Sequence, residues 1–430
     1  MENILIKNGN VLIYENDDIL IKKLDILIKE NKIEILSENI ADTADCKIID
    51  AENKYIMPGL INCHTHLAMS IFRESFEGCS LYEWLNEKIW PKEENLNEKD
   101  VYYATLLSYV EQISTGTTCT NDHYFFSESI RDAAEKAKVR TVLTRVLMDV
   151  DGAGQNRIDE FMKLYNSRTE NDLITYTVSP HGLYTCTGEY LEKVSKLAKE
   201  FKLPVHIHFL ESSDEVEDIK KIHGEEGIYV LEKYFSDTKN ILAHGVKLDE
   251  KDIAILKNMD NGIVHNPVSN LRLGCKIADI TKYKQNGINV ALGTDGQGSG
   301  SNLDMFEAMR LACLLQGGIH ENEERINAKD AIKMATINGA KMLGLDSKIG
   351  SIEEGKLADL IIINMDEKLN NITMVPNLNA ISNIVYNATG RNVETTIVNG
   401  QVLMENRKIN HIDIDEVLEE CKKTVNRLGL

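Results

Sequence analysis

Short runs in which apolar and polar residues alternate occupy both ends of the chain and predict β-strands. Residues 4–13 carry Asn8-Gly9 between two apolar runs, and residues 25–36 repeat this pattern around Glu30-Asn31, so each segment is predicted to be a hairpin. Near the other end, strands are predicted over 357–364, 382–386 and 394–403, the last with a turn at Asn399-Gly400. Residues 413–430 instead have apolar residues at helical spacing and predict a closing helix.

The two strand-rich ends are predicted to fold together. A single hairpin is marginally stable in water, so strands from either end need further strands to cover their apolar faces. We therefore expect a small discontinuous β-sandwich domain built from residues 1–57 and 350–430, with the closing helix as part of it.

Between the two ends, β-like runs alternate with helical patterns. The runs are residues 59–63, 117–124, 140–149, 174–180, 204–209, 240–245, 262–266 and 289–294. Helices are predicted over 99–113, 128–138, 188–201, 214–234 and 302–316. Eight such units in series are typical of a (β/α)8 barrel, so residues 58–349 are predicted to form a TIM-like barrel.

Composition and charge narrow the class of partner. The 430 residues are 43% hydrophobic and 27% charged, with a formal net charge of −20, which favours a globular protein without affinity for nucleic acid or anionic membranes. Neither a secretory leader nor a run of about 18 uncharged apolar residues is found, so a cytoplasmic protein is expected. The eight cysteines form no CxxC pair and suit reduced thiols. Composition and charge do not exclude a small-molecule substrate.

Histidines recur at the ends of the predicted barrel strands. His64 and His66 end the first run, His208 the fifth, His244 the sixth, and Asp295 follows the eighth. Because the carboxyl ends of all strands of a barrel face one mouth, these side chains are predicted to converge there. Imidazole and carboxylate are common ligands of divalent metals, so the convergence predicts a metal site. His206 shares a strand face with His208 and is predicted to lie deeper, in a packing or supporting role.

Glu211 lies three residues beyond His208. A carboxylate just outside a metal site can take a proton from water and pass it to a leaving group, as metal-assisted hydrolysis requires. Its other interpretation is a residue at the start of a helix, since Ser212, Ser213 and Asp214 are good capping residues. The spacing from His208 favours the catalytic interpretation.

These motifs together resemble the amidohydrolase superfamily of metal-dependent barrel hydrolases. The motifs are His-Thr-His after Pro-Gly-Leu-Ile-Asn, the later His-x-x-Glu, Ala-His-Gly, and Gly-Thr-Asp-Gly. The fourth run ends in Val178-Ser179-Pro180-His181, without the lysine that two-metal members use. The resemblance therefore implies a one-metal deaminase with His64, His66, His208 and Asp295 as ligands. Zn²⁺ is the expected ion, and Fe²⁺, Mn²⁺ or Ni²⁺ also suit such a ligand set.

Further segments resemble the 5-methylthioadenosine/S-adenosylhomocysteine deaminases. They are Leu81-Tyr82-Glu83-Trp84-Leu85, Ile89-Trp90-Pro91-Lys92-Glu93, Leu143-Thr144-Arg145, Arg157, and Gly296-Gln297-Gly298-Ser299. The resemblance implies that Glu93 holds the ribose hydroxyls and that Arg145 and Arg157 meet the ribose side or a homocysteine carboxylate. It also implies that His181 and Ser299 touch the purine or the sugar of the substrate. Trp84 is a further candidate for binding substrate. The alternatives are that each arginine pairs with a nearby acid and that Trp84 packs a loop.

The implied reaction is hydrolytic deamination of the adenine 6-amino group, giving the inosine analogue and ammonia. In it, Asp295 and His244 orient and deprotonate water, and Glu211 protonates the purine and contacts the substrate. Another heterocycle deaminase or a chlorohydrolase of the same superfamily is the alternative, and a non-catalytic scaffold is a remote one. The sequence leaves undecided the preferred nucleoside, the native metal, homo-oligomer formation, and the roles of His123, His206 and His265.

Overall fold

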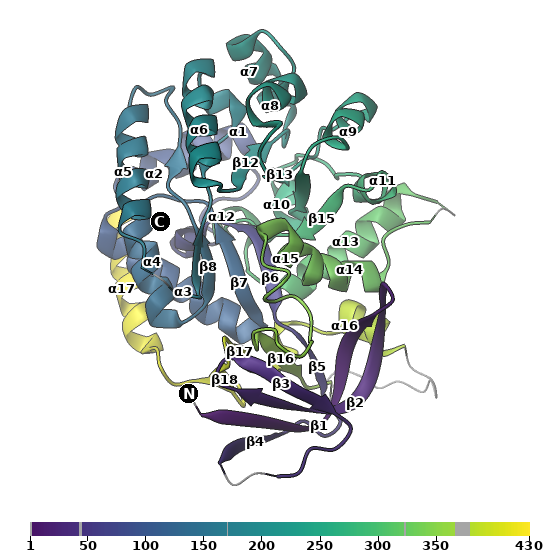
Figure 1. Ribbon diagram of the computed structural model, residues 1–430. Helices are drawn as coiled ribbons and strands as arrows, with labels where there is room; N and C mark the ends of the chain where they lie inside the picture. Colours follow the sequence, from purple (N-terminus) through teal and green to yellow (C-terminus); the bar gives the residue numbers. More distant parts are fainter. Residues whose placement is uncertain (1, 43–44, 170, 322–323, 366–378) are drawn as a thin grey trace.

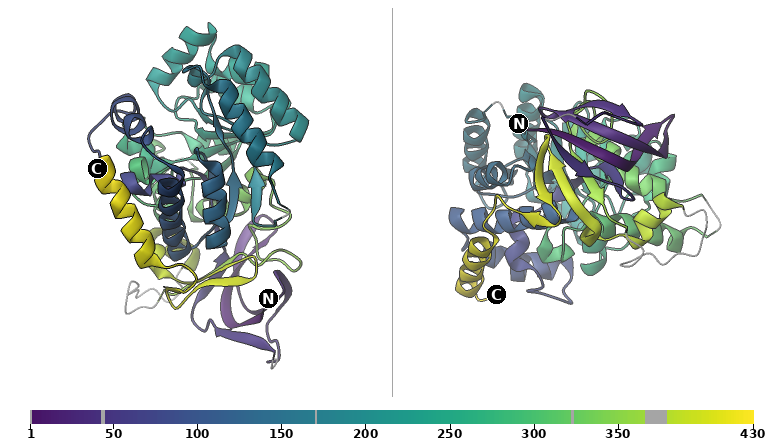
Figure 2. Two further views of the ribbon diagram at one scale, coloured as in Figure 1. Left: turned by 90° about the vertical axis from the view of Figure 1, so that its left-hand side faces the viewer. Right: turned by 90° about the horizontal axis from the view of Figure 1, so that it is seen from below.

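The computed structural model contains a barrel with a strand-rich layer at one end (Figure 1). It describes residues 2–42, 45–169, 171–321, 324–365 and 379–430. The N-terminal strands and the strands near the C-terminus lie together below the barrel, and Figure 2 shows this layer from two further sides. This arrangement confirms the predicted TIM-like barrel with a β domain drawn from both ends of the chain.

The barrel strands follow one another in chain order. They are β6 (Leu60–Thr65), β7 (Thr117–Asp122), β8 (Arg140–Leu143), β10 (Ile174–Tyr176), β12 (Val205–Phe209), β13 (Asn240–His244), β14 (Asn261–His265) and β15 (Asn289–Leu292). All of the recorded ladders among them are parallel. The ring closes through a bridge between Val178 and Val205 and through the Asp295 amide, which donates to the His64 carbonyl oxygen at 3.1 Å. The last bond places the first and eighth strand ends side by side.

Two predicted barrel runs are each divided in the structure. Residues 140–149 form β8 and then β9 (Val146–Leu147), and residues 174–180 form β10 and then β11 (Ser179–Pro180). β9 and β11 pair with one another in parallel as a short extension of the barrel. This extension carries Arg145 and His181 past the strand ends toward the mouth.

Helices cover the outside of the barrel and fill the connections at its mouth. The longer ones are α3 (Glu98–Thr115), α4 (Ser127–Ala137), α5 (Gly154–Asn166), α6 (Gly188–Phe201), α7 (Ser213–His223), α8 (Gly227–Phe235) and α13 (Met305–Ile319). The shorter ones are α9 (Glu250–Leu256), α10 (Pro267–Arg272), α11 (Ile280–Gln285), α12 (Gln297–Gly300), α14 (Ala328–Met334) and α15 (Ile337–Leu343). The helix predicted over 214–234 is divided because Gly224 ends α7 in a left-handed conformation (φ 70°).

The connection after β6 is built from short helical pieces. They are η1 (Leu67–Phe72), α1 (Leu81–Glu83), the π-helical turn η2 (Trp84–Ile89) and α2 (Trp90–Glu93); η3 (Leu183–Thr185) follows β11. π-helical turns are rare and occur often at functional sites. Here the turn presents Trp84 and Ile89 to the pocket at the barrel mouth.

Strands from both ends of the chain pair into one nine-stranded sheet. Its members are β1 (Asn3–Glu15), β2 (Asp18–Lys29), β3 (Lys32–Ser37), β4 (Cys46–Asp50), β5 (Tyr55–Pro58), β16 (Leu360–Ile363), β17 (Val393–Val398), β18 (Gln401–Glu405) and β19 (Lys408–Ile409). β5 and β16 join the two halves in antiparallel register. The core under this sheet is rich in isoleucine, with Ile4, Ile26, Ile33, Ile362 and Ile397 all buried. The predicted hairpin at Glu30-Asn31 and the turn at Asn399-Gly400 are confirmed.

The predicted hairpin over residues 4–13 is wrong. β1 continues through Asn8-Gly9, where its register against β2 shifts, and the chain reverses later at Asn16-Asp17. Asn8 takes a left-handed conformation (φ 62°) in this bulge. A Cβ on Gly9 would lie 2.2 Å from Ile56 Cδ1, so glycine is needed for close packing of β5 rather than for a turn.

The strand predicted over 382–386 is also wrong, because these residues lie within helix α16 (Ala380–Asn387). Asn379 caps the helix, and Ile381, Ile384 and Val385 are buried at helical spacing. The turn η4 (Gly390–Asn392) follows it, and the closing helix is confirmed as α17 (Ile414–Leu428). α17 packs against α3 of the barrel.

The domain limits 1–57 with 350–430, and 58–349, stay a prediction, and residues 366–378 of the first lie outside the described residues. At the predicted junction, a Cβ on Gly59 would lie 2.1 Å from Thr118 Oγ1, so glycine lets the chain pass from β5 into β6 beside β7. No described helix is both long and apolar enough to cross a membrane.

Candidate active site

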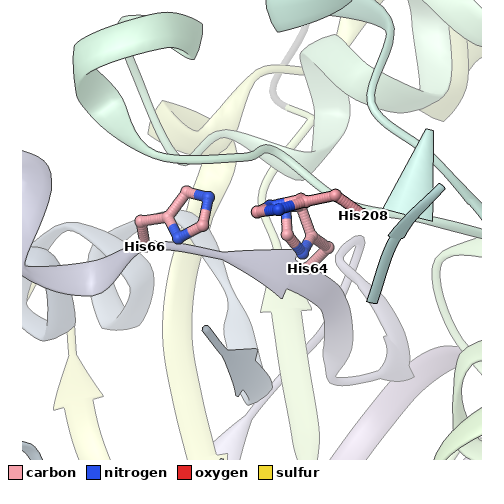
Figure 3. Close-up of side chains that lie close together, drawn as sticks. All are labelled: His64, His66 and His208. Carbon is pink, nitrogen blue, oxygen red and sulfur yellow. The ribbon is translucent and has the colours of Figure 1, made fainter. Parts of the chain in front are cut away.

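Three histidine rings meet at the mouth of the barrel (Figure 3). His64 lies on β6, His66 directly after it, and His208 on β12. Their ring centroids are 4.9 to 5.3 Å apart in each pair. The candidate ligand atoms of these three histidines lie within 4.8 Å of one another, and the same holds for His64, His244 and Asp295. The two groups share His64, which gives one compact cluster of donors.

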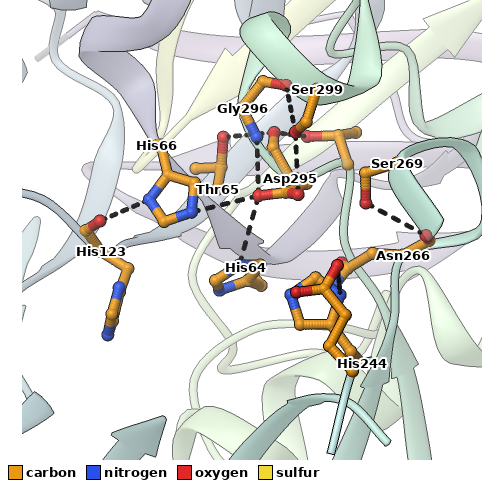
Figure 4. Close-up of polar contacts among 12 residues, drawn as sticks. His64, Thr65, His66, His123, His244, Asn266, Ser269, Asp295, Gly296 and Ser299 are labelled. Carbon is orange, nitrogen blue, oxygen red and sulfur yellow. Dashed lines mark hydrogen bonds and ion pairs between the residues drawn. The ribbon is translucent and has the colours of Figure 1, made fainter. Parts of the chain in front are cut away.

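The hydrogen bonds of two rings leave their Nε2 atoms available. His66 Nδ1 donates to the backbone carbonyl oxygen of His123 at 2.5 Å, so its Nε2 carries a lone pair (Figure 4). His64 Nδ1 lies 2.9 Å from His206 Nε2, while His64 Nε2 is buried and makes no hydrogen bond with the described residues. A buried nitrogen without a partner is costly unless another group binds it. The cluster therefore fits a divalent metal ion held by imidazole nitrogens and one carboxylate.

Asp295 supplies the carboxylate. Its Oδ1 lies 3.1 Å from His66 Nε2 and 3.4 Å from His64 Nε2, and it accepts from the Gly296 amide at 2.9 Å (Figure 4). Burial alone would raise the pKa of Asp295, but its close contacts with the His64 and His66 rings outweigh burial and hold the pKa well below the ordinary value. The residue takes the left-handed conformation (φ 60°), a strained backbone geometry of the kind found at functional sites.

Glu211 and His244 form a second polar pair beside the metal cluster. His244 Nδ1 lies 3.3 Å from Glu211 Oε1, and the amide of Asn270 donates to both, at 2.9 and 3.1 Å. Asn266 donates to the same His244 nitrogen at 3.3 Å. Because Nδ1 accepts these bonds, the neutral ring carries its hydrogen on Nε2. Burial lowers the pKa of His244 to about 3, which keeps the ring neutral.

Glu211 is held as a neutral acid. Burial raises the pKa of its carboxyl well above the ordinary value, and the charges of Asp295 and Glu215 add to the effect. The backbone is fixed by Glu215, which accepts from the amides of Leu210 and Glu211 at 2.9 and 2.6 Å. A carboxyl that keeps its proton at neutral pH can act as a general acid.

A cavity of about 490 Å³ opens directly above this cluster. Glu93, Trp84 and His181 line it, together with His66, His208, Glu211, His244 and Asp295. Tyr124 donates to Glu93 Oε1 at 2.5 Å, and burial raises the pKa of Glu93 to about 7. Trp84 is buried, and its indole nitrogen makes no hydrogen bond within the described part of the chain. Burial lowers the pKa of His181 to about 3, so its ring faces the cavity as neutral imidazole.

The two candidate arginines line the same cavity, but each has a partner already. Arg145 Nε donates to Glu160 Oε2 at 2.5 Å, and Arg157 donates to both carboxylate oxygens of Asp151. The alternative that each arginine pairs with a nearby acid therefore describes the observed contacts. Contact of either arginine with substrate stays a prediction.

Ser299 contacts Asp295 in the structure, and its predicted contact with substrate stays a prediction. It does not line the cavity, and its hydroxyl donates to Asp295 Oδ2 at 2.9 Å from the buried side of that carboxylate. A serine in this position helps to hold Asp295 in place. His206 instead occupies the supporting place that its position on the strand predicted, beneath His64.

Several residues of the site were not singled out from the sequence. Asn266 and Asn270 hold His244, Glu215 holds the backbone at Glu211, and Cys275 Sγ lies 3.7 Å from Glu211 Oε1. His123, whose role the sequence left undecided, lines the cavity beside His208, with ring centroids 4.5 Å apart. Asn266 and Asn270 follow the seventh strand in the segment His-Asn-Pro-Val-Ser-Asn, which was the available signal.

Comparisons with known proteins agree with this geometry. Residues 55–403 match the sequence model described as "Amidohydrolase family". A 5-methylthioadenosine/S-adenosylhomocysteine deaminase of Thermoanaerobacter pseudethanolicus is 38% identical over 431 residues, 99% of each chain. A 5'-deoxyadenosine deaminase of Methanosphaera stadtmanae is 39% identical over 404 residues, 93% of this chain and 94% of that protein. A crystal structure of a Xanthomonas campestris adenosine deaminase with bound zinc matches with a TM-score of 0.92 and 26% identity, covering 99% of this chain and 98% of the other.

Proposed function

The chain belongs to the amidohydrolase family, and from that premise we propose that it is a metal-dependent deaminase of adenine nucleosides modified at the 5′ carbon. Its substrates would be 5′-methylthioadenosine, S-adenosylhomocysteine or their 5′-deoxy relatives, and its products the inosine analogue and ammonia. The observation that carries this proposal is the neutral Glu211 acid beside a His-and-Asp donor cluster, at the floor of a cavity that also contains Glu93.

We propose His64, His66, His208 and Asp295 as the residues that hold one divalent ion, with Zn²⁺ first and Fe²⁺, Mn²⁺ or Ni²⁺ as alternatives. When bound, such an ion supplies a Lewis acid that lowers the pKa of water to about 7. The rest of the chemistry falls to the side chains around it.

Each of the neighbouring side chains has one task in this scheme. Asp295 is ionised and accepts a proton from the attacking water. His244 presents Nε2–H and orients that water, since its Nδ1 is taken by Asn270. Glu211 Oε1 accepts from Asn270, so the acidic proton is held at Oε2 and passes to the purine ring nitrogen as oxygen bonds to C6. Asp295 then passes its proton to the 6-amino group, the C6–N bond breaks to release ammonia, and the proton left on the new C6 oxygen returns to Glu211.

Glu93 would recognise the sugar. A carboxylate accepts from two vicinal hydroxyls, and Glu93 lies on the cavity wall formed by the connection after β6. This feature favours a nucleoside over a free base such as guanine or cytosine, because a free base has no ribose to hold.

We also propose that the protein acts in the cytoplasm. That compartment keeps thiols reduced, which suits the six buried free cysteines Cys63, Cys119, Cys186, Cys275, Cys313 and Cys421.

Ammonia release by metal-loaded protein tests the proposal. The panel contains adenosine, methylthioadenosine, S-adenosylhomocysteine, guanine and cytosine, and turnover is expected with the adenine nucleosides. Glu211→Gln should retain metal and lose about 10²- to 10⁴-fold in kcat. Release from guanine or cytosine alone, with no effect of Glu93→Ala on it, would assign the site to a free-base deaminase instead.

A further inference from the structure

Each of the two arginines that line the cavity forms an ion pair with an acidic side chain of the protein. Arg157 donates to Asp151 Oδ1 and Oδ2 at 2.6 and 2.5 Å, and its Nη1 also donates to the Met148 carbonyl oxygen at 2.8 Å. Arg145 donates from Nε to Glu160 at 2.5 Å and from Nη1 to the Val146 carbonyl oxygen at 2.7 Å. Guanidinium binds carboxylate best through two parallel hydrogen bonds. In Arg157 that pair of donors already serves Asp151, and in Arg145 the Nε and Nη1 donors already have acceptors.

The charges at this end of the cavity also balance. Two guanidinium groups face two carboxylates, so an arriving carboxylate meets no excess of positive charge. Phe125, Phe126, Met148 and Val150 line the same cavity. An apolar thioether or methyl group gains from such surroundings, whereas a charged group loses water without gaining an unpaired partner.

We infer that Asp151 and Glu160 are specificity-determining residues that turn this end of the cavity toward uncharged 5′ substituents and against the homocysteine carboxylate. The inference rests on the proposed function and names its preferred substrates: adenosines whose 5′ group is a short alkyl thioether or a methyl group. S-adenosylhomocysteine, whose amino-acid end carries a carboxylate and an ammonium, is the poorer substrate.

The size of the effect follows from the exposure of the acids. The Glu160 and Asp151 side chains are 57% and 47% exposed, while those of Arg145 and Arg157 are 14% and 12% exposed. Ion pairs with one exposed member are weak, so a substrate carboxylate can displace the acids at a moderate cost. We expect a preference of about tenfold in kcat/KM rather than complete exclusion.

Substrate competition kinetics on matched variants test the inference. For the unmodified protein, kcat/KM for methylthioadenosine and 5′-deoxyadenosine should exceed that for S-adenosylhomocysteine by about tenfold. Glu160→Gln removes the charge that pairs with Arg145, and Asp151→Asn removes the charge that pairs with Arg157. The asparagine keeps a side-chain oxygen for the Ala153 amide, which donates to Asp151 Oδ1 at 3.1 Å. Both variants should lower KM for S-adenosylhomocysteine several-fold, and the ratio of kcat/KM for methylthioadenosine to that for S-adenosylhomocysteine should fall by a similar factor. Glu192→Gln, in the exposed pair with Lys196, is the control and should change neither.

Two outcomes would overturn the inference while leaving the proposed function intact. The first is equal or higher kcat/KM for S-adenosylhomocysteine in the unmodified protein. The second is a selective rise in its KM in Asp151→Asn, because Asp151 would then be binding the homocysteine ammonium. Loss of the proposed function has a different signature, namely no ammonia from any adenine nucleoside.

Discussion

Glu211 Oε1 lies 3.3 Å from His244 Nδ1, and one amide, that of Asn270, donates to both atoms. This shared donor sets two protonation states at once. It makes His244 Nδ1 an acceptor and so places the ring hydrogen on Nε2, and it occupies Glu211 Oε1 and so leaves Oε2 for the acidic proton. The acid and the water-orienting ring are therefore coupled through a residue that is itself none of the four candidate metal ligands.

Asn270→Ala should lower kcat by about 10²-fold, because both groups lose the bond that fixes their hydrogens. Metal content should stay unchanged, since Asn270 holds none of the four candidate ligands. Asn258→Ala is the control, as its amide only donates to the Ala254 carbonyl oxygen on an exposed helix end. Steady-state kinetics with metal analysis decide the matter, and turnover of the Asn270 variant within twofold of normal would contradict this role.

His206→Phe should weaken metal binding by about 10- to 100-fold, because His206 Nε2 is the partner that fixes the His64 ring through Nδ1. Phenylalanine keeps an aromatic ring in the buried space and removes the nitrogens. His265→Phe is the matched control: His265 is equally buried, and its ring nitrogens make no hydrogen bond with other described residues. Competition with a chelator measures both affinities, and equal losses in the two variants would indicate a packing effect only.

Glu93→Gln should stabilise the protein increasingly as pH rises. The folded pKa of Glu93 is raised to about 7 by burial, so between the ordinary value near 4.5 and pH 7 the folded state binds more protons than the unfolded one. Stability is therefore lost over this window as pH increases, by at most about 3 kcal/mol. Denaturant unfolding of both proteins from pH 4 to 8 measures the difference, which should be smallest at pH 4. A constant difference across this range would contradict the raised pKa.

Arg140→Met should lower the free energy of unfolding by about 3 to 5 kcal/mol. Arg140 on β8 makes two hydrogen bonds to Asp359 next to β16, at 2.9 and 3.0 Å, and both side chains are 1% exposed. Removing the guanidinium leaves a buried carboxylate with only the Asn399 amide as a recorded donor. Lys196→Met, in an exposed pair, is the control and should change stability by less than about 1 kcal/mol. Denaturant unfolding of the metal-loaded proteins measures this change. An unchanged free energy of unfolding in Arg140→Met would show that the ion pair does not stabilise the contact between barrel and sheet.

The sequence by itself determined those features that depend on local periodicity. Side chains two residues apart share a strand face, which placed His64 with His66 and His206 with His208, and the order of strands in a barrel brought His244 and Asp295 to the same mouth. Glu211 was found because its distance along the chain from His208 is short. The turn at Glu30-Asn31 and helix α17 were predicted for the same reason, since each is specified within a few residues.

Only the tertiary structure decided which partners each of these side chains meets. Asn8-Gly9 has the composition of a turn but forms a bulge, because Ile56 packs against Gly9 from a distant strand. Ser299 lies behind Asp295 rather than in the cavity, and Asn270 reaches Glu211 from 59 positions away. The pairing of Arg145 with Glu160 and of Arg157 with Asp151 likewise follows from how α5 and the loop before it lie on the barrel. Hydrogen bonds and ion pairs depend on distances of a few ångströms between elements, and residue type and spacing along the chain do not contain those distances.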